Sequence, residues 1–236
     1  MTDPQVALAN CDTLMLDMDG TVLDLAFDNY VWKELIPSEF AKLHGMTSEA
    51  ARKQLLAHYR SMQGKLDWYC LDHWSERLGL DILAIHRTVN HRIGFLPGAR
   101  QFLEAVAQKD LRLLLVTNSH PDTLALKAEV TGVTRFFDAI YSAHEVGHAK
   151  EDQSFWHALK EAEGFDPQST LFVDDTVAVL QSAADFGIGM LVRITRPDST
   201  QVLREDSRTI PRTVPRTNPR TESEFAGIES VAELLR

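Results

Sequence analysis

Cysteine is scarce in this sequence, with only two among 236 residues. Cys11 and Cys70 do not form a spaced motif, so the sequence predicts neither a disulfide framework nor a cysteine-rich metal site, which is compatible with a reducing compartment. The N-terminus lacks a basic region followed by an apolar core, so we expect no signal peptide. No apolar run approaches the roughly 20 residues that a membrane helix needs. These absences predict a cytoplasmic protein with no membrane partner.

Positive charge is also in short supply. The chain has 24 Lys and Arg against 34 Asp and Glu, which gives a formal net charge of -10. An acidic surface argues against binding to nucleic acid or to anionic membranes. It would also repel an anionic substrate, so a phosphate site would need a local cation. The length suits one large domain, or a core domain with a smaller insert, and no feature indicates the oligomeric state.

The most unusual stretch follows the first apolar run. Residues 14–16 predict a buried strand, which ends in two carboxylates, Asp17 and Asp19, and then Gly20. Successive strand residues alternate between faces, so Asp17 and Asp19 can point the same way. Two like charges this close are costly unless a cation or a shared proton relieves them.

Residues 24–95 show helical patterns and no strong strand candidate. Asp28 is expected to cap a helix that Pro37 stops. Further N-cap candidates precede the next apolar stripes at Thr47, Asp67 and Asp81. We therefore predict a helical insert, the cap, over residues 24–95.

From residue 96 onward, strand and helix patterns alternate. The predicted strands cover residues 113–116, 139–142, 170–173 and 190–194. Such alternation predicts an α/β fold in which a parallel sheet is covered on both faces. The core domain is then residues 1–23 together with 96–236.

The C-terminal region contains a repeat. Pro-Arg-Thr occurs three times between residues 209 and 221. Proline removes backbone donors and no apolar stripe is present, so residues 205–222 are interpreted as a low-complexity connector. A sharper alternative is a segment that binds an anionic partner. Beyond it, a short terminal helix that docks on the core is expected from four apolar residues: Ile228, Val231, Leu234 and Leu235.

Polar side chains follow several of the predicted strands. Thr117 and Asn118 follow the second strand, and Asp174 and Asp175 follow the fourth. The carboxyl ends of parallel strands share one edge of a sheet, and ligands bind there. Lys150, in the loop region after the third strand, can reach the same edge.

Each of these residue types suits phosphoryl chemistry. Carboxylate oxygens of Asp17 and Asp175 with a backbone carbonyl are suitable Mg²⁺ ligands. Asp17 can attack phosphorus, and Asp19 can protonate the leaving oxygen and then activate water. A helix begins after Thr117 and Asn118, which favours anion binding there. Lys150 can balance the phosphoryl charge.

The motifs resemble those of the haloacid dehalogenase-like phosphohydrolase superfamily. Asp17-Met18-Asp19-Gly20-Thr21 resembles its first motif, 117–119 the second, Lys150 the third and 174–175 the fourth. The resemblance implies a Rossmann-like core with a helical cap inserted after the first motif. It further implies Asp17 as nucleophile, Asp19 as general acid and base with its carbonyl on Mg²⁺, Asp175 as a direct metal ligand, and Asp174 acting through a metal-bound water. The family often has Lys-Pro at the third motif, whereas Glu151 follows Lys150 here.

The resemblance also bears on the substrate. Dehalogenases of the superfamily lack an acid at the position of Asp19 and need no metal, so phosphate chemistry is favoured. Residues 23–30 and 67–76 resemble bacterial nucleotidases of the superfamily that act on purine monophosphates such as GMP and IMP. Aromatic side chains interleaved with Asp and Asn can also stack on a base, although a helix stripe usually packs into a core. The candidate substrate-binding residues are Phe27, Asp28, Asn29, Tyr30, Trp68 and Tyr69.

We therefore predict a Mg²⁺-dependent 5′-nucleotidase that forms a phospho-aspartate on Asp17. One alternative is a phosphatase for small phosphosugars or phosphoglycolate. A second alternative, from another class, is a binding protein that keeps the fold without turnover.

Overall fold

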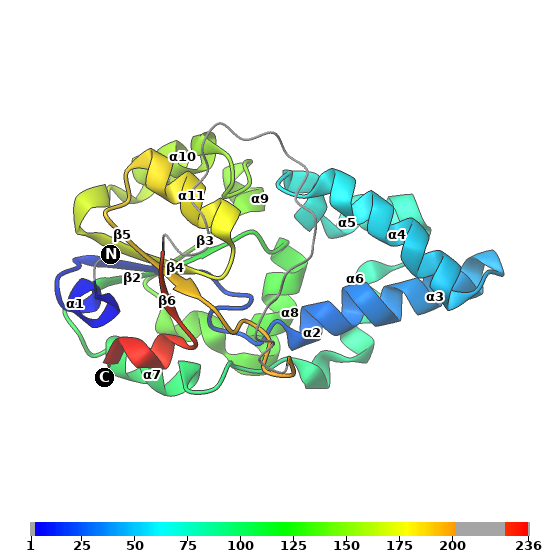
Figure 1. Cartoon of the computed structure of the whole chain (residues 1–236), viewed down its shortest axis with the longest axis horizontal. Helices are drawn as coiled ribbons and strands as arrows, with labels where there is room; N and C mark the ends of the chain where they lie inside the picture. The colour runs from blue at the N-terminus through cyan, green and yellow to red at the C-terminus, as the bar shows by residue number, and fades with distance from the viewer. Residues whose placement is uncertain (1–2, 202–224, 236) are drawn as a thin grey trace.

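A parallel sheet forms the centre of the molecule, as seen in a computed structural model that describes residues 3–201 and 225–235 (Figure 1). Its strand order is β3-β2-β1-β4-β5-β6, and every neighbouring pair is parallel. The strands are β1 (Thr13–Leu16), β2 (Arg112–Thr117), β3 (Ala139–Ser142), β4 (Thr170–Asp174), β5 (Met190–Ile194) and β6 (Ala226–Ile228). The predicted α/β fold is confirmed, while the Pro-Arg-Thr repeat lies outside the described residues.

The central strand β1 shows why the sheet needs helices on both faces. Leu14 and Leu16 belong to one buried cluster, Met15 belongs to another, and all three are fully buried. Because side chains on both faces of this strand are buried, polar residues do not alternate with apolar ones. The sequence of the strand is therefore a continuous apolar run.

Helices cover the two faces of the sheet as separate layers (Figure 1). Residues of α10 and α11 pack in the cluster of Met15, and residues of α1, α7 and α8 pack in that of Leu14. The core helices are α1 (Pro4–Ala9), α7 (Ala99–Val106), α8 (Pro121–Thr131), α9 (Ala143–Val146), α10 (Gln153–Glu163) and α11 (Val177–Phe186).

The insert after β1 extends away from the sheet as a group of helices, at the right of Figure 1. Its helices are α2 (Ala26–Tyr30), α3 (Ile36–His44), α4 (Ser48–Met62), α5 (Leu71–Leu78) and α6 (Ile82–Thr88). Within the described ranges, none of the helices of this protein combines the length and apolar character that a membrane span requires.

The start of the insert differs from the sequence prediction. Asp28 lies inside α2 rather than at its cap, because the helix begins earlier, where Asp24 accepts from the backbone N–H of Ala26 at 3.0 Å. Pro37 does not stop the helix. It lies in the first turn of α3 after a π-helical turn (Val31–Leu35), where the backbone hydrogen-bond pattern changes and a missing donor is tolerated.

The later cap signals have mixed outcomes. The side chain of Thr47 accepts a hydrogen bond from the backbone N–H of Ala50 at 3.2 Å. The side chain of Asp81 accepts one from the backbone N–H of Ala84 at 2.8 Å, so both predicted N-caps are confirmed. Asp67 instead lies in a 3-10 helix (Leu66–Tyr69), and Cys70 occupies the N-cap position of α5 without a capping hydrogen bond from its side chain.

An aromatic cluster fills the interior of the insert. Its ring centroids lie 5.1 to 6.4 Å apart, mostly edge to face, and its members are Trp32, Tyr59, Trp68 and Trp74. Such contacts stabilise beyond the apolar area that they bury. The predicted substrate residue Trp68 is therefore part of the packing of the cap.

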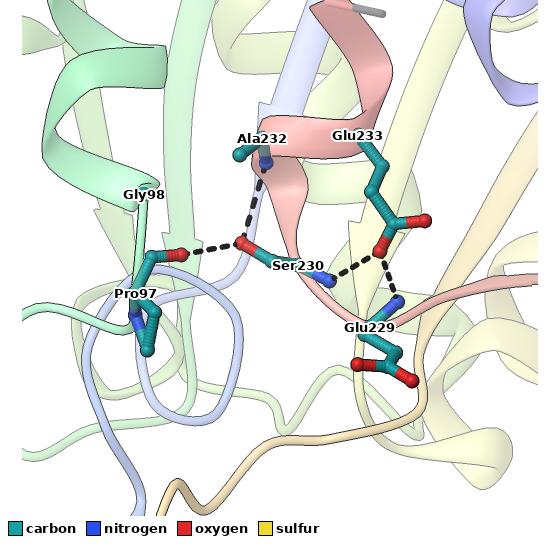
Figure 2. A pocket seen from close by; sticks show the side chains of 6 residues that line it. All are labelled: Pro97, Gly98, Glu229, Ser230, Ala232 and Glu233. Atoms are coloured by element: carbon teal, nitrogen blue, oxygen red, sulfur yellow. Dashed lines mark hydrogen bonds between the residues drawn. The ribbon is translucent and has the colours of Figure 1, made fainter.

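The C-terminal segment returns to the core, as predicted, and adds the strand β6 that the sequence did not indicate. A 3-10 helix (Val231–Leu235) follows it, with Val231 and Leu234 buried. A hollow of about 550 Å³ lies beside this segment (Figure 2), and there the Ser230 hydroxyl donates to the carbonyl of Pro97 at 2.8 Å. Gly98 permits the close approach, because its φ is +80° and an added Cβ would lie 2.8 Å from Ala232.

Candidate active site

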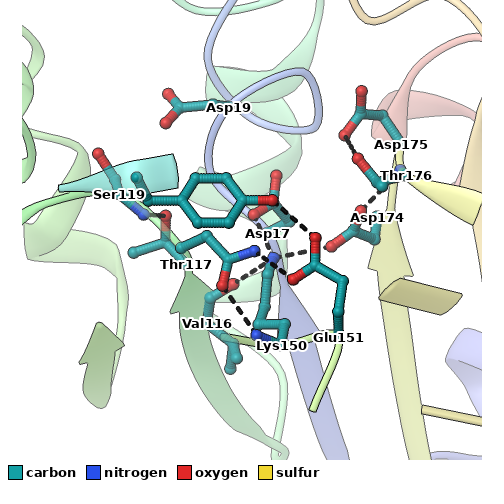
Figure 3. Close-up of polar contacts among 12 residues, drawn as sticks. Asp17, Asp19, Val116, Thr117, Ser119, Lys150, Glu151, Asp174, Asp175 and Thr176 are labelled. Carbon is teal, nitrogen blue, oxygen red and sulfur yellow. Dashed lines mark hydrogen bonds and ion pairs between the residues drawn. The ribbon is translucent and has the colours of Figure 1, made fainter. Parts of the chain in front are cut away.

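The carboxyl ends of β1, β2 and β4 bring the predicted site residues to one edge of the sheet (Figure 3). Asp17 directly follows β1, and its N–H extends the ladder by donating to the carbonyl of Val173 at 3.0 Å. Thr117 and Asp174 are the last residues of β2 and β4. The convergence therefore follows from the parallel arrangement itself.

Lys150 is the buried cation that holds two of these carboxylates. Its side chain is 2% exposed, and its Nζ donates to Oδ1 of Asp17 at 2.5 Å, to Oδ2 of Asp174 at 2.8 Å and to the carbonyl of Val116 at 3.1 Å. Burial alone would lower the pKa of this lysine, but the two carboxylates outweigh burial and raise it. Lys150 is therefore charged at neutral pH.

One lysine does not neutralise the acids around it. Burial raises the pKa of Asp17 well above its usual value against the opposing effect of Lys150. Burial and the nearby Asp174 raise the pKa of Asp175 to about 7. Carboxylate oxygens of Asp17, Asp174 and Asp175 lie within 4.8 Å of one another. This buried excess of negative charge, offered by hard oxygen donors, fits a divalent cation such as Mg²⁺.

The two acids after β4 differ in their hydrogen bonds. Asp174 uses both oxygens, since Oδ2 accepts from Lys150 and Oδ1 accepts from the N–H of Thr176 at 2.7 Å. The hydrogen bond from the Thr176 hydroxyl to Asp175 engages Oδ1 at 3.1 Å. Asp175 therefore keeps more oxygen for a cation than Asp174 does.

Gly20 lets the loop after β1 pass close to these acids. Its φ is +88°, and an added Cβ would lie 3.0 Å from Cγ of Asp175 and 2.9 Å from Cβ of Pro197. The glycine that follows the two carboxylates in the sequence is therefore required by the backbone conformation and by the close approach.

Asp19 makes a separate ion pair with residues that the sequence did not single out together. Its Oδ1 accepts from Nζ of Lys127 at 2.7 Å, and the same Nζ donates to both oxygens of Asp28 at 2.8 and 2.9 Å. Lys127, on α8, is 1% exposed. Burial raises the pKa of Asp19 to about 6, while Lys127 lowers it and Asp28 raises it. In Figure 3, Asp19 stands apart from the acids around Lys150.

The loop after β2 connects the cation to the cap. The Asn118 Oδ1 accepts from the backbone N–H of Lys150 at 2.9 Å, and its Nδ2 donates to Glu151 at 3.0 Å. Glu151 also accepts from the Tyr69 hydroxyl of the cap at 2.7 Å. Thr117 accepts the N–H of Ser119 through its hydroxyl at 3.0 Å. Glu151 was missed as a site residue, although its place after Lys150, where proline is usual, was the available signal.

Several candidate substrate residues of the cap pair or pack elsewhere. Phe27 is 1% exposed. The Asn29 amide donates to Asp198 at 2.7 Å, and the Tyr30 ring lies 3.9 Å from the guanidinium carbon of Arg92. These three side chains are therefore buried or paired with residues outside the strand-end site. The structure links two other candidates to that site: Tyr69 through Glu151, and Asp28 through Lys127.

The edge combines three chemical capacities. It offers carboxylate oxygens for a hard cation, a buried ammonium group beside the loop that leads from β2 into α8, and a carboxyl, Asp19, whose pKa is raised to about 6. Phosphoryl transfer requires positioning, charge neutralisation and an acid or base of this kind.

Comparisons with known proteins identify relatives along most of the chain. A family model described as haloacid dehalogenase-like hydrolase matches residues 11–187. The GMP/IMP nucleotidase YrfG of Escherichia coli (strain K12) is 44% identical over 194 residues, which cover 82% of this chain and 87% of that protein. A phosphoglycolate phosphatase of Pseudomonas syringae is 23% identical over 180 residues, or 74% of this chain and 66% of that protein.

Solved structures share the fold at low identity. A haloacid dehalogenase-like phosphatase from Thermococcus onnurineus is 19% identical with a TM-score of 0.72, covering 94% of this chain and 95% of its own. An L-2-haloacid dehalogenase from Xanthobacter autotrophicus is 18% identical with a TM-score of 0.58, covering 95% and 97%. At these identities the likeness concerns the fold alone.

Proposed function

Because the chain belongs to the haloacid dehalogenase-like hydrolases, we propose that it is a Mg²⁺-dependent 5′-nucleotidase acting on purine monophosphates such as GMP and IMP. The observation that carries the reaction is the buried Lys150 between Asp17 and Asp174, with Asp175 in the same group. The similarity to a GMP/IMP nucleotidase supports the substrate class.

Asp17 is proposed as the nucleophile. Its carboxylate oxygen attacks phosphorus, an acyl phosphate forms on Asp17, and the bond from phosphorus to the ribose oxygen breaks. The ammonium group of Lys150, which donates to Asp17 at 2.5 Å, lowers the negative charge that the incoming phosphate meets. The hydroxyl of Thr117 and the backbone N–H of Asn118, next to the start of α8, are proposed to donate to phosphoryl oxygens.

Asp19 is proposed as the general acid and base. Its protonated form gives a proton to the departing ribose oxygen, and its ionised form then takes one from the water that attacks the acyl phosphate. That attack releases inorganic phosphate and restores Asp17. A pKa of about 6 supports both roles, because each form is accessible near neutral pH.

The residues proposed to hold Mg²⁺ are Asp17, Asp175 and the backbone carbonyl of Asp19, with Asp174 supporting them. When bound, the ion would neutralise part of the negative charge of the phosphoryl group. The uncompensated carboxylates described above support this assignment.

Recognition of the nucleoside is proposed to fall to the part of the cap nearest the strand ends. Tyr69 is the candidate supported by a contact with the core, through Glu151. Trp68 is proposed to contribute indirectly by positioning Tyr69, because its ring holds the same segment in the aromatic cluster of the cap.

The test is a phosphate-release assay over a panel of monoesters, with Mg²⁺ and with a chelator. We expect GMP and IMP to have the highest kcat/KM, and turnover to require Mg²⁺. Asp17→Asn should abolish release while the melting curve stays cooperative. Retained activity in that variant would contradict the mechanism.

A phosphatase for phosphoglycolate or small phosphosugars is the second candidate. The similarity to a phosphoglycolate phosphatase favours it, although at 23% identity. If phosphoglycolate or a sugar phosphate is hydrolysed with a far higher kcat/KM than GMP and IMP, this candidate replaces the nucleotidase.

A further inference from the structure

Three side chains with nitrogen and sulfur donors meet where the cap faces the core. Ligand atoms of Cys70, His120 and His144 lie within 4.8 Å of one another. Cys70 stands between the 3-10 helix (Leu66–Tyr69) and α5 in the cap, whereas His120 caps α8 and His144 lies in α9. The fold therefore brings together three segments that are distant in the sequence.

His144, a member of this cluster, has a buried ring nitrogen, Nε2, that finds no hydrogen-bond partner among residues 3–201 and 225–235. The His144 ring meets that of His120 edge to face, with the two centroids 4.9 Å apart. A buried nitrogen without a partner calls for an explanation, and a bound ion would supply one.

His120 has carboxylates on both sides of its ring. Its Nε2 lies 3.9 Å from Asp72, and its Nδ1 lies 3.8 Å from the carboxylate of Asp122. Asp72, His120 and Asp122 form a second group within 4.8 Å that shares His120 with the first. Coordination through Nε2 would place the ring proton on Nδ1, where the Asp122 carboxylate can accept it. The N–H of Asp122, which now donates to Nδ1 at 3.3 Å, would give up that bond.

We propose that Cys70, His120 and His144 bind a divalent transition metal of the Zn²⁺ type, with Asp72 as an oxygen ligand. Thiolate and imidazole donors select Zn²⁺ over Mg²⁺. The cluster of Asp17, Asp174 and Asp175 offers only carboxylate oxygens, which suit Mg²⁺. Zinc bonds of about 2.0–2.3 Å separate tetrahedral donors by about 3.5 Å. The donors of Cys70, His120 and His144 lie within 4.8 Å of one another and need only a small shift to reach that geometry, and Asp72 approaches the group through His120, 3.9 Å from its Nε2.

The ion would tie the cap to the core. Cys70 follows Tyr69, whose hydroxyl bonds to Glu151 beside the cation Lys150. A metal shared by Cys70 and two core histidines would hold this segment over the strand ends and slow the exchange of substrate and product. Zn²⁺ is therefore expected to inhibit turnover, an effect that rests on the proposed function.

The site itself is tested without substrate. The full chain is freed of metal and saturated with Mg²⁺, which is expected to occupy the carboxylates of Asp17, Asp174 and Asp175. It is then titrated with Co²⁺. We expect one Co²⁺ per chain to produce visible bands typical of tetrahedral cobalt and a near-ultraviolet thiolate-to-cobalt band. Zn²⁺ should remove both. Failure of the thiolate band to appear overturns the proposal.

Variants assign the band to its ligands. Cys70→Ser should lose the thiolate band, and His144→Gln should weaken Co²⁺ binding by at least about tenfold. The matched control is Cys11→Ser, which changes the only other cysteine and should keep the band. A band that survives Cys70→Ser, or one lost in Cys11→Ser, overturns the proposal.

A second readout separates this site from the proposed function. At one fixed concentration, Zn²⁺ in excess Mg²⁺ should raise the melting temperature of the wild-type protein more than that of His144→Gln. This comparison remains informative if Cys70→Ser does not fold. An equal shift in both proteins overturns the site. A protein that binds Co²⁺ as expected but hydrolyses no monoester contradicts only the proposed function.

Discussion

At the scale of single residues, the ion pairs around Lys127 adjust the acidity of Asp19. Lys127 is 1% exposed and forms ion pairs with Asp19, which follows β1, and with Asp28, which lies in α2 of the cap. Lys127 lowers the pKa of Asp19 and Asp28 raises it. The two partners therefore act in opposite directions on the proposed general acid.

Substitutions of these partners should shift the pH profile of kcat in opposite directions. Lys127→Met removes the cation and should move the Asp19 limb to higher pH by about one unit, while Asp28→Asn removes a negative charge and should move it to lower pH. Lys127→Met should also lower the unfolding free energy by about 1–3 kcal/mol, because it leaves the partly buried carboxylates of Asp19 and Asp28 without their cation. Shifts in the same direction, or none in either variant, would count against Asp19 as the titrating group.

The sequence predicts some of these residues and not others for a physical reason. Asp17 and Asp175 follow apolar strands, so their place at the edge of the sheet comes from local pattern and parallel topology. Lys127 lies in the middle of a helix, and its partners come from distant segments. Nothing in the local sequence distinguishes it among the 24 Lys and Arg of the chain.

At the scale of secondary-structure elements, the cap meets the core through Tyr69 and Glu151. The hydroxyl of Tyr69 donates to Glu151 at 2.7 Å, and Asn118 donates to the same carboxylate at 3.0 Å. Burial, and then Glu151, raises the pKa of Tyr69 well above its usual value. Tyr69 therefore remains a hydrogen-bond donor at neutral pH.

Breaking this contact should weaken substrate binding more than folding. We expect Tyr69→Phe and Glu151→Ala, each of which removes one partner of the bond, to raise KM for GMP several-fold. The double variant should show a coupling of about 1 kcal/mol, since the second change removes a bond that the first has already broken. Tyr30→Phe is the matched control and should leave KM unchanged, because the Tyr30 ring stacks on Arg92. Fully additive effects would show that the bond does not matter for binding.

His86 makes the cap sensitive to acid. It is 1% exposed, its Nδ1 lies 2.7 Å from the carbonyl of Ile82, and burial lowers its pKa to about 4 from 6.5. Because the folded-state pKa lies below the unfolded value, its contribution to stability is present above about pH 6.5 and is lost as pH falls toward 4.

The comparison with His86→Gln isolates this effect. The unfolding free energy of the wild type, minus that of the variant, should fall by at most about 3 kcal/mol between pH 6.5 and 4. Chemical denaturation at each pH measures it. A difference that does not change with pH would contradict a buried neutral histidine.

Element boundaries were predictable only where local chemistry decides them. Thr47 and Asp81 cap their helices because each side chain accepts from a backbone N–H three residues on. The expectation that Pro37 stops a helix is wrong because Pro37 lies in the first turn of α3, after the π-helical turn, where a missing donor is tolerated. β6 was missed because Ala226–Ile228 is short, contains glycine, and becomes a strand only by pairing with β5.

At the scale of the whole molecule, a chain of net charge -10 keeps a buried group of acids at the edge of its sheet. The folded-state pKa of Asp175 is raised to about 7 from 3.8. Its contribution to stability is therefore present below about pH 3.8 and is lost as pH rises through 7. At pH 8 the metal-free protein therefore has a lower unfolding free energy, because Asp175 is ionised in a site that disfavours its charge.

Mg²⁺ should offset this loss of stability. At a concentration 100 times its dissociation constant, it should add about 2.7 kcal/mol to the unfolding free energy of the wild type at pH 8. Asp175→Asn should be more stable than the metal-free wild type at pH 8 and should respond weakly to Mg²⁺. Melting curves with and without the ion measure both effects, and an equal response in the two proteins would remove Asp175 from the metal site.

The central claim is that Asp17 carries the phosphoryl group during hydrolysis of a purine monophosphate. The most direct measurement is to quench the enzyme during turnover of GMP with Mg²⁺, reduce any acyl phosphate with borohydride, and identify the modified peptide by mass spectrometry. The account predicts homoserine at position 17, and no reduced residue in Asp17→Asn or without GMP. An unmodified Asp17 under conditions of full turnover, or a reduced residue elsewhere in the chain, would contradict it.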